Sequence, residues 1–542
     1  MNDPSPAETA PPKSPAPVSA WAPLAQPTFR LLWGVWLTAN IAMWMNDVAA
    51  AWMMTTLTDS PTMVALVQAA TTLPVFLFGL PSGALADIVD RRRFMIATQV
   101  WVGAVALVVC AVLLADAMSP RLLLLLTFAN GIGLALRWPV FSAIVPEVVP
   151  ARQLPAALAL NAIAMNASRI AGPILAGLLI ASAGSIYVFI LNALLSVATG
   201  ITLVRWKRKQ TASALPGEHL MGAMRVGIQY VAQSRRMHAS LLRTSIFFTQ
   251  SIALMALLPL VAKRIGHGDA TTFTWLLASL GAGAICIATV LQRLRQRMNR
   301  DDLIRNGTLL MATAMLVVSV APNIFVAAPA MLVAGIAWLG VGNTLSVAAQ
   351  LSLPNWVRAR GMSIYQMAMM GSGALGAALW GQVASLTSVR SSLWLAAASG
   401  VIAMAWSSRF RLDGVDEEDL SPTDLFKAPV AARAIDPDDG PVMVTIDYLI
   451  DPALANEFKQ VMQDSRRSRL RHGALEWQLY LDSADPGRYT EYFLDESWVS
   501  HLRRFDRLTA ADATLRERRL QFHIGARPPV VLRRIAEPLQ GR

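Results

Sequence analysis

The sequence predicts an all-α polytopic membrane protein that carries a small α+β domain at its C-terminal end. Apolar runs of about 20 residues recur through the first three quarters of the 542-residue chain. Each run is long enough to cross a hydrocarbon core of roughly 30 Å as a helix. Only 15% of the residues are charged, against about 25% in soluble domains. Run length and the lack of polar helix faces exclude a large soluble all-α protein.

The apolar runs predict twelve helices in two six-helix halves. Turn-forming residues such as Asp59-Ser60-Pro61 and Ser119-Pro120 separate them. The expected spans are residues 29–54, 62–86, 94–116, 122–145, 156–182, 186–205, 239–262, 271–292, 302–320, 324–348, 361–385 and 390–409. A longer loop joins the halves. Within it, apolar residues at helical spacing from Glu218 to Met237 predict an amphipathic helix on the membrane surface.

These features divide the chain into six parts. They are a disordered N-terminal tail (1–27), a first six-helix bundle (28–205), a cytoplasmic linker with the amphipathic helix (206–238), a second six-helix bundle (239–411), a proline-rich linker (412–440) and a ferredoxin-like α+β domain (441–538). The N-terminal tail has no basic segment leading into a short apolar core, so we do not expect a signal peptide.

Basic residues gather in the loops on one side of the predicted membrane. The net charge of +12 fits a nucleic-acid partner, but arginines such as Arg91 to Arg93 lie in short loops, where the positive-inside rule explains them. We therefore expect a multi-pass protein of the inner (plasma) membrane, in contact with lipid and with both termini in the cytoplasm. Cys110 and Cys286 lie within apolar runs without metal-ligand spacing, so we expect neither metal nor cofactor.

The loop after the second span carries the most informative motif. Residues 83–93 read Gly-Ala-Leu-Ala-Asp-Ile-Val-Asp-Arg-Arg-Arg. This run resembles the cytoplasmic loop between helices 2 and 3 of major facilitator superfamily transporters, and departs from it at Ile88 and Asp90. The resemblance implies a conformational latch whose carboxylate lies near a helix N-terminus of the other half, where the helix dipole favours it. The expected latch residues are Gly83, Asp87, Arg91 and Arg92.

A Gly-Pro step in the fifth span resembles the exporter-associated motif of the same superfamily. Residues 166–177 include Gly172, Pro173 and Gly177. Small residues let two helices approach closely, and proline frees a backbone carbonyl. The motif favours export over import. The alternative is a packing kink without any role in direction.

Three ionisable residues stand out inside the predicted spans, where such residues are costly and usually functional. They are Asp47, Arg137 and Arg169. With a rise of about 1.5 Å per residue, Asp47 and Arg169 fall at similar depths in the outer half, and Arg137 lies nearer the cytoplasm. We hypothesise that Asp47 pairs with Arg169 and that a proton or cationic substrate competes for Asp47; a static buried pair is the alternative. Expected residues of a polar cavity are Asn40, Asn46, Gln68, Asn130, Asn161, Gln250, Asn343 and Gln366.

The C-terminal residues predict the element order βαββαβ. Strands are expected at 442–448, 475–481, 489–495 and 530–535, with helices at 453–472 and 498–522. The order, together with the run Glu476 to Tyr480 and the run Glu496 to Phe505, resembles dimeric antibiotic-biosynthesis-monooxygenase-like domains. The resemblance implies a homodimer through this domain. An aromatic pocket for cofactor-free oxygenation would use Trp477, Tyr480, Tyr492, Trp498 and His501; the alternative is that they fill the core and the dimer interface.

The span pattern and the tail together resemble the enterobactin-exporter-like group of bacterial secretion effectors. The resemblance implies a proton-coupled antiporter, not an enzyme, which exports a siderophore or drug-like molecule by alternating access. Three alternatives remain: an importer, a membrane-anchored cofactor-free oxygenase, and a sensor that acts through the C-terminal domain.

Overall fold

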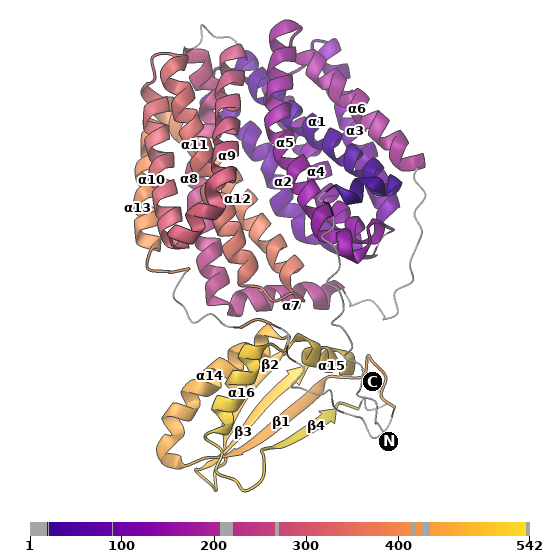
Figure 1. Ribbon diagram of the computed structural model, residues 1–542, viewed down its shortest axis with the longest axis vertical. Coiled ribbons are helices and arrows are strands. Elements are labelled where there is room, and N and C mark those ends of the chain that lie inside the picture. Colours follow the sequence, from indigo (N-terminus) through magenta and orange to yellow (C-terminus); the bar gives the residue numbers. More distant parts are fainter. Residues whose placement is uncertain are drawn as a thin grey trace, which may run out of the picture.

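The computed structural model describes residues 19, 21–88, 90–205, 220–265, 270–412, 419–421, 423, 429 and 434–537. In this part of the chain, twelve long helices form a bundle, and a small α+β domain lies beyond one end of it (Figure 1). The long helices are α1 (Pro27–Leu57), α2 (Pro61–Ile88), α3 (Arg91–Leu114), α4 (Pro120–Val148), α5 (Leu154–Ser182), α6 (Ser185–Arg205), α8 (Arg235–Ile265), α9 (Ala270–Arg297), α10 (Arg300–Val320), α11 (Ile324–Leu351), α12 (Arg358–Leu386) and α13 (Val389–Ser407).

Ten of the long helices in the described ranges are long and apolar enough to cross a membrane. The exceptions are α1 and α12, which have 31 and 29 residues but contain no stretch that is apolar enough by the same measure. In α1, Asn40 and Asn46 are buried against other helices rather than facing outward. Hydropathy alone therefore supports ten of the twelve expected spans, and α1 directs some of its polar groups into the protein.

Local capping explains where several helices begin. The side chain of Ser119 accepts a hydrogen bond from the backbone N–H of Leu122 at the start of α4, and Ser388 does the same for Ser391 at the start of α13. Such caps satisfy backbone donors that a helix leaves unpaired. Ser234 likewise accepts from the Met237 N–H at 3.3 Å. The amphipathic helix, α7 (Leu220–Gln233), therefore ends before Met237, and α8 begins earlier than expected.

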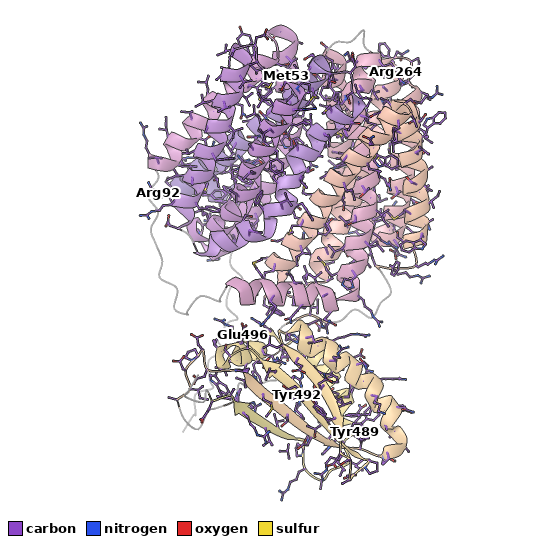
Figure 2. All side chains as sticks on the ribbon, turned by 180° about the vertical axis from the view of Figure 1, so that it is seen from behind. Met53, Arg92, Arg264, Tyr489, Tyr492 and Glu496 are labelled. Atoms are coloured by element: carbon purple, nitrogen blue, oxygen red, sulfur yellow. The ribbon has the colours of Figure 1, made fainter. Side chains whose placement is uncertain are left out.

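The N-terminal half, α1 to α6, packs against the C-terminal half, α8 to α13, mainly through α2 on α12 and α5 on α9. Several contacts between the halves lie close in sequence to Met53 and Arg264, which Figure 2 shows at the end of the bundle farther from the α+β domain. There the Lys263 ammonium donates to the Thr55 carbonyl at 3.0 Å, and the Thr62 hydroxyl donates to Gln382 Oε1 at 3.2 Å. Below them the rings of Trp52 and Phe273 stack at 5.9 Å. The two halves are thus joined at this end.

The α+β domain contains one antiparallel sheet in the order β2-β3-β1-β4. Its elements are β1 (Val442–Leu449), α14 (Ala455–Arg471), β2 (Glu476–Leu481), β3 (Arg488–Asp495), α15 (Trp498–Arg507), α16 (Ala510–Leu520) and β4 (Val530–Ile535). Strand alternation turns Val444 and Phe493 toward the helices, into a core with Phe458. The single helix expected at 498–522 is wrong: extended backbone at Thr509, which forms a capping box with Asp512, splits it into α15 and α16.

The domain docks on α7, which runs crosswise beneath the bundle (Figure 1). The Arg225 guanidinium pairs with the Glu496 carboxylate at 2.8 Å, and Figure 2 shows Glu496 on the side of the domain nearest α7. Trp356 lies in the loop between α11 and α12. The Arg507 guanidinium lies 4.9 Å from the centroid of its ring, and the His472 ring lies 6.0 Å from that centroid. The domain is therefore held by α7 and by the C-terminal half.

Candidate functional site

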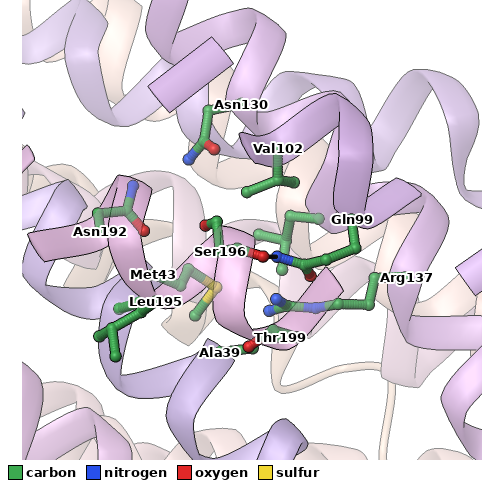
Figure 3. Close-up of a pocket in the computed structure, with 12 residues that line it drawn as sticks. Ala39, Met43, Gln99, Val102, Asn130, Arg137, Asn192, Leu195, Ser196 and Thr199 are labelled. Atoms are coloured by element: carbon green, nitrogen blue, oxygen red, sulfur yellow. Dashed lines mark hydrogen bonds between the residues drawn. The ribbon is translucent and has the colours of Figure 1, made fainter. Parts of the chain in front are cut away.

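A small cavity with both polar and apolar lining residues lies inside the N-terminal half, between α1, α3, α4 and α6 (Figure 3). Its volume is ≈ 20 Å³, measured as the space open to the centre of a water molecule. The lining residues are Ala39, Ala42, Met43, Gln99, Val102, Asn130, Leu134, Arg137, Asn192, Leu195, Ser196 and Thr199. A second cavity of ≈ 10 Å³ shares Asn130 and Asn192 with the first and is bordered by Asn46. Space of this size holds one or two water-sized molecules, so neither cavity admits an organic substrate.

Hydrogen bonds between helices fix the walls of these cavities. The Gln99 side-chain amide of α3 donates to the Ser196 carbonyl of α6 at 3.1 Å. The Asn192 amide of α6 donates to Asn46 Oδ1 of α1 at 3.2 Å. Of the eight amide residues expected to line a polar cavity, Asn46 and Asn130 border the two cavities. Asn40 does not line them: its side-chain amide donates to the Trp36 carbonyl of its own helix at 2.7 Å.

Arg137 brings a positive charge to the first cavity from α4. Its side chain is only 8% exposed, and its guanidinium lies 5.5 Å from the Trp36 ring centroid. Trp36 in turn stacks on Phe141 at 3.9 Å. Within the described residues, no carboxylate lies within ion-pair distance of Arg137, and its Nε has no hydrogen-bond partner. Among the described residues, the aromatic face of Trp36 is therefore the contact that holds the guanidinium.

Asp47 and Arg169 lie on α1 and α5, which pack side by side. Both are half-buried, but no ion pair or hydrogen bond joins them in the part of the chain that the structure describes. The Arg169 guanidinium instead lies 5.4 Å from the ring centroid of Trp44, three residues before Asp47. The structure therefore brings the two helices together without forming the expected pair. Asp47 has no hydrogen-bond or ion-pair partner among the described residues.

The small residues of α5 lie where helices approach most closely. A Cβ added at Gly172 would lie 2.4 Å from the Trp44 Cβ of α1, and one at Gly177 would lie 1.7 Å from the Thr274 hydroxyl oxygen of α9. Pro173 lies within the helix between them. Because Gly177 faces the other half, the space that it leaves lets α5 and α9 meet at the joined end of the bundle.

The structure places only part of the expected latch. The backbone of Gly83 and Asp87 belongs to α2 and that of Arg91 to α3, but their side chains lie outside the described residues. Arg92 Nη2 donates to the Val204 carbonyl near the end of α6 at 2.6 Å. Asp90 caps α3 by accepting a hydrogen bond from the Arg93 N–H at 2.9 Å.

One buried ion pair of the C-terminal half was not expected from the sequence. Arg243 of α8 is 2% exposed and pairs with Asp301 at the start of α10; it also donates to the Ser407 carbonyl at 3.3 Å. The only signal in the sequence is an arginine inside the span predicted at 239–262, followed much later by an acidic residue at the start of another span.

The aromatic residues expected to form one pocket in the C-terminal domain are divided between two faces of the sheet. Trp477 faces the helices and donates to Glu491 at 3.0 Å. Tyr480 and Tyr492 lie on the opposite face, 6.1 Å apart. His501 packs 5.6 Å from Trp498 on the helix side and accepts a hydrogen bond from Arg533. Strand alternation therefore separates these side chains, and their arrangement fits the core-filling alternative.

Two buried groups of this domain, Glu491 and His501, have partners among the described residues. Glu491 is completely buried and accepts hydrogen bonds from Ser465, Arg469 and Arg519 at 2.9, 3.1 and 3.1 Å. Although burial opposes ionisation, the two guanidinium groups hold the pKa of Glu491 below its usual range. Burial lowers the pKa of His501 to about 4, assisted by Arg533. His501 Nδ1 lies 2.8 Å from Asp495 while its Nε2 accepts from Arg533, an arrangement that suits the neutral ring.

Solved structures share the helical fold at low sequence identity. The nucleoside transporter NupG aligns with a TM-score of 0.59 and 12% identity, over 70% of this chain and 99% of that one. A bacterial homologue of the human lysosomal transporter Spinster, inward-facing and occupied, aligns with a TM-score of 0.59 and 15% identity, over 72% and 98%. At these identities the similarity shows the fold alone.

The curated relatives align with less than half of this chain. Macrolide efflux protein A of Streptococcus pyogenes is 23% identical over 242 residues, which are 44% of this chain and 60% of that protein. The protein of the same name from Enterococcus faecalis is 24% identical over 198 residues, 36% of this chain and 61% of that protein. The chain thus spans about three fifths of these relatives. The profile of the transmembrane secretion effector family matches residues 18–540. The chain therefore belongs to the transmembrane secretion effector family of the major facilitator superfamily.

Proposed function

We propose that the protein is a secondary active transporter that exports small amphipathic organic molecules, of drug or siderophore type, in exchange for protons. The family membership and the similarity to macrolide efflux proteins support efflux. Twelve membrane-crossing helices would rock as two halves around a site between them. The arginine-rich loops support a cytoplasmic location for the α+β domain and both termini of an inner-membrane protein.

The unpaired carboxylate of Asp47 is the observation that carries proton coupling. An acidic side chain within a membrane helix is costly unless it has a partner or a task. Asp47 lies in α1 without a partner among the described residues, and Arg169 is held by Trp44 instead. A carboxylate in this setting takes up a proton when the site faces one side, and releases it to the solvent when the site faces the other side and a cationic or polar substrate binds.

Alternating access is supported by the contacts between the halves. Direct contacts from α1 and α2 to α8, α9 and α12 hold the end far from the α+β domain together. This end would be the periplasmic one. The latch around Asp87 would close the cytoplasmic end in the opposite state, when the periplasmic end is open. Gly177 would permit closure at the periplasmic end.

Proton movement in everted membrane vesicles tests the proposal. Vesicles that contain the wild-type protein are energised, and a pH-sensitive dye reports the proton gradient while macrolides, siderophores and lipophilic cations are added one at a time. We expect at least one compound to dissipate the gradient, and Asp47→Asn to abolish that response. Asp116→Asn is the matched control, because Asp116 is exposed and its left-handed backbone (φ 51°) also suits asparagine.

Each result bears on a different part of the proposal. A response that persists in Asp47→Asn would remove Asp47 from coupling and leave export standing. Uptake of a compound into cells, with no release from them, would favour an importer. A lack of response to every compound, with the protein present in the vesicles, would contradict proton-coupled export of these classes.

We also propose that the C-terminal domain pairs with a second copy of itself through the open face of its sheet. Tyr480, Val530 and Leu532 are exposed there, at 55%, 55% and 40%. Native mass spectrometry of the full chain in detergent tests this. A dimer that Tyr480→Lys converts to monomers would support the proposal, and a monomeric wild-type protein would contradict it.

A further inference from the structure

We propose that the cavity beside Arg137 is a binding site for a small monovalent anion of the halide class, with chloride as the physiological occupant. The inference concerns the interior of the N-terminal half rather than the pathway between the halves. It does not depend on the direction, coupling or substrate of transport, because anion binding can be measured without transport.

The charge balance of the cavity is the first argument. Arg137 is 8% exposed and lies in a membrane helix. None of the twelve residues that line the cavity is acidic. A buried charge without a counter-charge is strongly disfavoured, and the Trp36 ring at 5.5 Å offers only a weak substitute. A bound anion would supply the missing negative charge.

The donors around the cavity form the second argument. Beside the guanidinium, Asn130 contributes an amide, and Ser196 and Thr199 contribute hydroxyl groups. None of these three side chains has a hydrogen bond to another described residue. Figure 3 shows Arg137, Gln99 and Thr199 together on one side of the cavity. A site with a cation, free N–H and O–H donors and no carboxylate favours an anion over a cation.

Size selects the class of anion. The cavity leaves ≈ 20 Å³ open to the centre of a water-sized sphere, which is room for a single halide ion or one water molecule. It excludes gluconate, citrate and any drug-like substrate. An anion here would hold α1, α3, α4 and α6 together, so its occupancy should stabilise the N-terminal half against heat.

Thermal unfolding of the purified full-length protein in detergent tests the site. The midpoint is measured in sodium chloride and in sodium bromide, with sodium gluconate added to keep the ionic strength constant. We expect a saturable upward shift with chloride or bromide and no shift with gluconate alone. Arg137→Gln should lose the shift, and Thr199→Val should need a higher chloride concentration to reach it.

Arg169→Gln is the matched control. Arg169 is the other arginine that lies over a tryptophan in this half, but it does not line the cavity. This variant should keep the wild-type chloride response. An equal loss in both variants would mean that chloride acts on surface charge or on folding in general, and would overturn the proposal.

A crystal of the wild-type protein grown in bromide gives the direct readout, and it remains available if Arg137→Gln does not fold. An anomalous peak between Arg137 and Asn130 would support the site. A water molecule at that position without an anomalous signal would overturn the proposal, as would a wild-type protein whose stability is the same in chloride and gluconate.

Discussion

The N-terminal half and the remainder of the chain treat buried arginines differently. In the C-terminal half and the α+β domain, three buried arginines are each less than 10% exposed and each forms an ion pair with a carboxylate. The pairs are Arg243 with Asp301, Arg504 with Asp495 and Arg519 with Glu491. In the N-terminal half, Arg137 is equally buried but has no carboxylate partner among the described residues. Paired charges of this kind hold elements together. Unpaired ones mark places where a proton, an ion or a substrate acts.

Removing a paired carboxylate should have the largest effect. Asp301→Ala leaves the Arg243 guanidinium buried without its counter-charge, and we expect the C-terminal half to lose about 3 kcal/mol of stability. The neighbouring Asp302→Ala is the control, because Asp302 forms an exposed pair with Arg305 at 2.8 Å and should cost less than about 1 kcal/mol. Both changes remove one acid from the first turn of α10, so the helix dipole contributes equally. Similar unfolding midpoints for the two variants would contradict the comparison.

Acid should weaken the α+β domain through His501. Its pKa in the folded protein is lowered to about 4, below the usual 6.5, so the unfolded chain binds a proton first as the pH falls. The contribution is complete above about pH 6.5 and is lost between pH 6.5 and 4, where we expect a loss of about 2 kcal/mol. Hydrogen exchange of peptides from β3 and α15 measures this loss. His501→Gln should reduce the pH dependence in that window without removing it, because burial also lowers the pKa of His472 to about 4; an unchanged dependence would assign it to another group.

Replacing the unpaired arginine should have a smaller effect of opposite sign. In a chloride-free medium, Arg137→Met removes a buried charge without breaking an ion pair, and we expect stability to be unchanged or to rise by about 1 kcal/mol. Thermal unfolding beside Arg243→Met checks this, since the latter leaves Asp301 without its partner. A loss of several kcal/mol in Arg137→Met would show that Arg137 has a structural role like that of Arg243.

The contact between the α+β domain and α7 should contribute least. Arg225 and Glu496 pair at 2.8 Å but are partly exposed, with side-chain exposures of 32% and 48%. We expect Arg225→Ala to cost about 0.5 kcal/mol and to raise hydrogen exchange in α7 only slightly. Trp356→Ala should raise it more, because the Trp356 ring contacts both Arg507 and His472. Equal exchange in both variants would place the docking elsewhere.

Sequence patterns predicted the elements well because each depends on local chemistry. Strand alternation predicted β3 to within one residue of its observed bounds, and apolar run length predicted the helical bundle. The break between α15 and α16 was not predicted. It lies at Thr509, and its capping box depends on one side chain, that of Asp512.

The contacts between individual side chains could not be predicted from the sequence, for a geometric reason. Depth along two helices gives one coordinate. It suggested a pair of Asp47 and Arg169, and their helices α1 and α5 do pack side by side. The rotation of each helix decides the contact, and it turns Arg169 to Trp44 instead. The cavity of Gln99, Asn130 and Ser196 likewise arises from the packing of α3, α4 and α6, which periodicity does not specify.

Proton release on substrate binding tests the central claim most directly. Purified wild-type protein in weakly buffered detergent is mixed with a transported compound, and a pH indicator follows the solution beside Asp47→Asn and Asp116→Asn. If the unpaired carboxylate in the N-terminal half is the coupling group, the wild-type and Asp116→Asn proteins release protons and Asp47→Asn does not, while still binding the compound. Equal proton release from all three proteins would contradict the claim that Asp47 links the substrate to the proton.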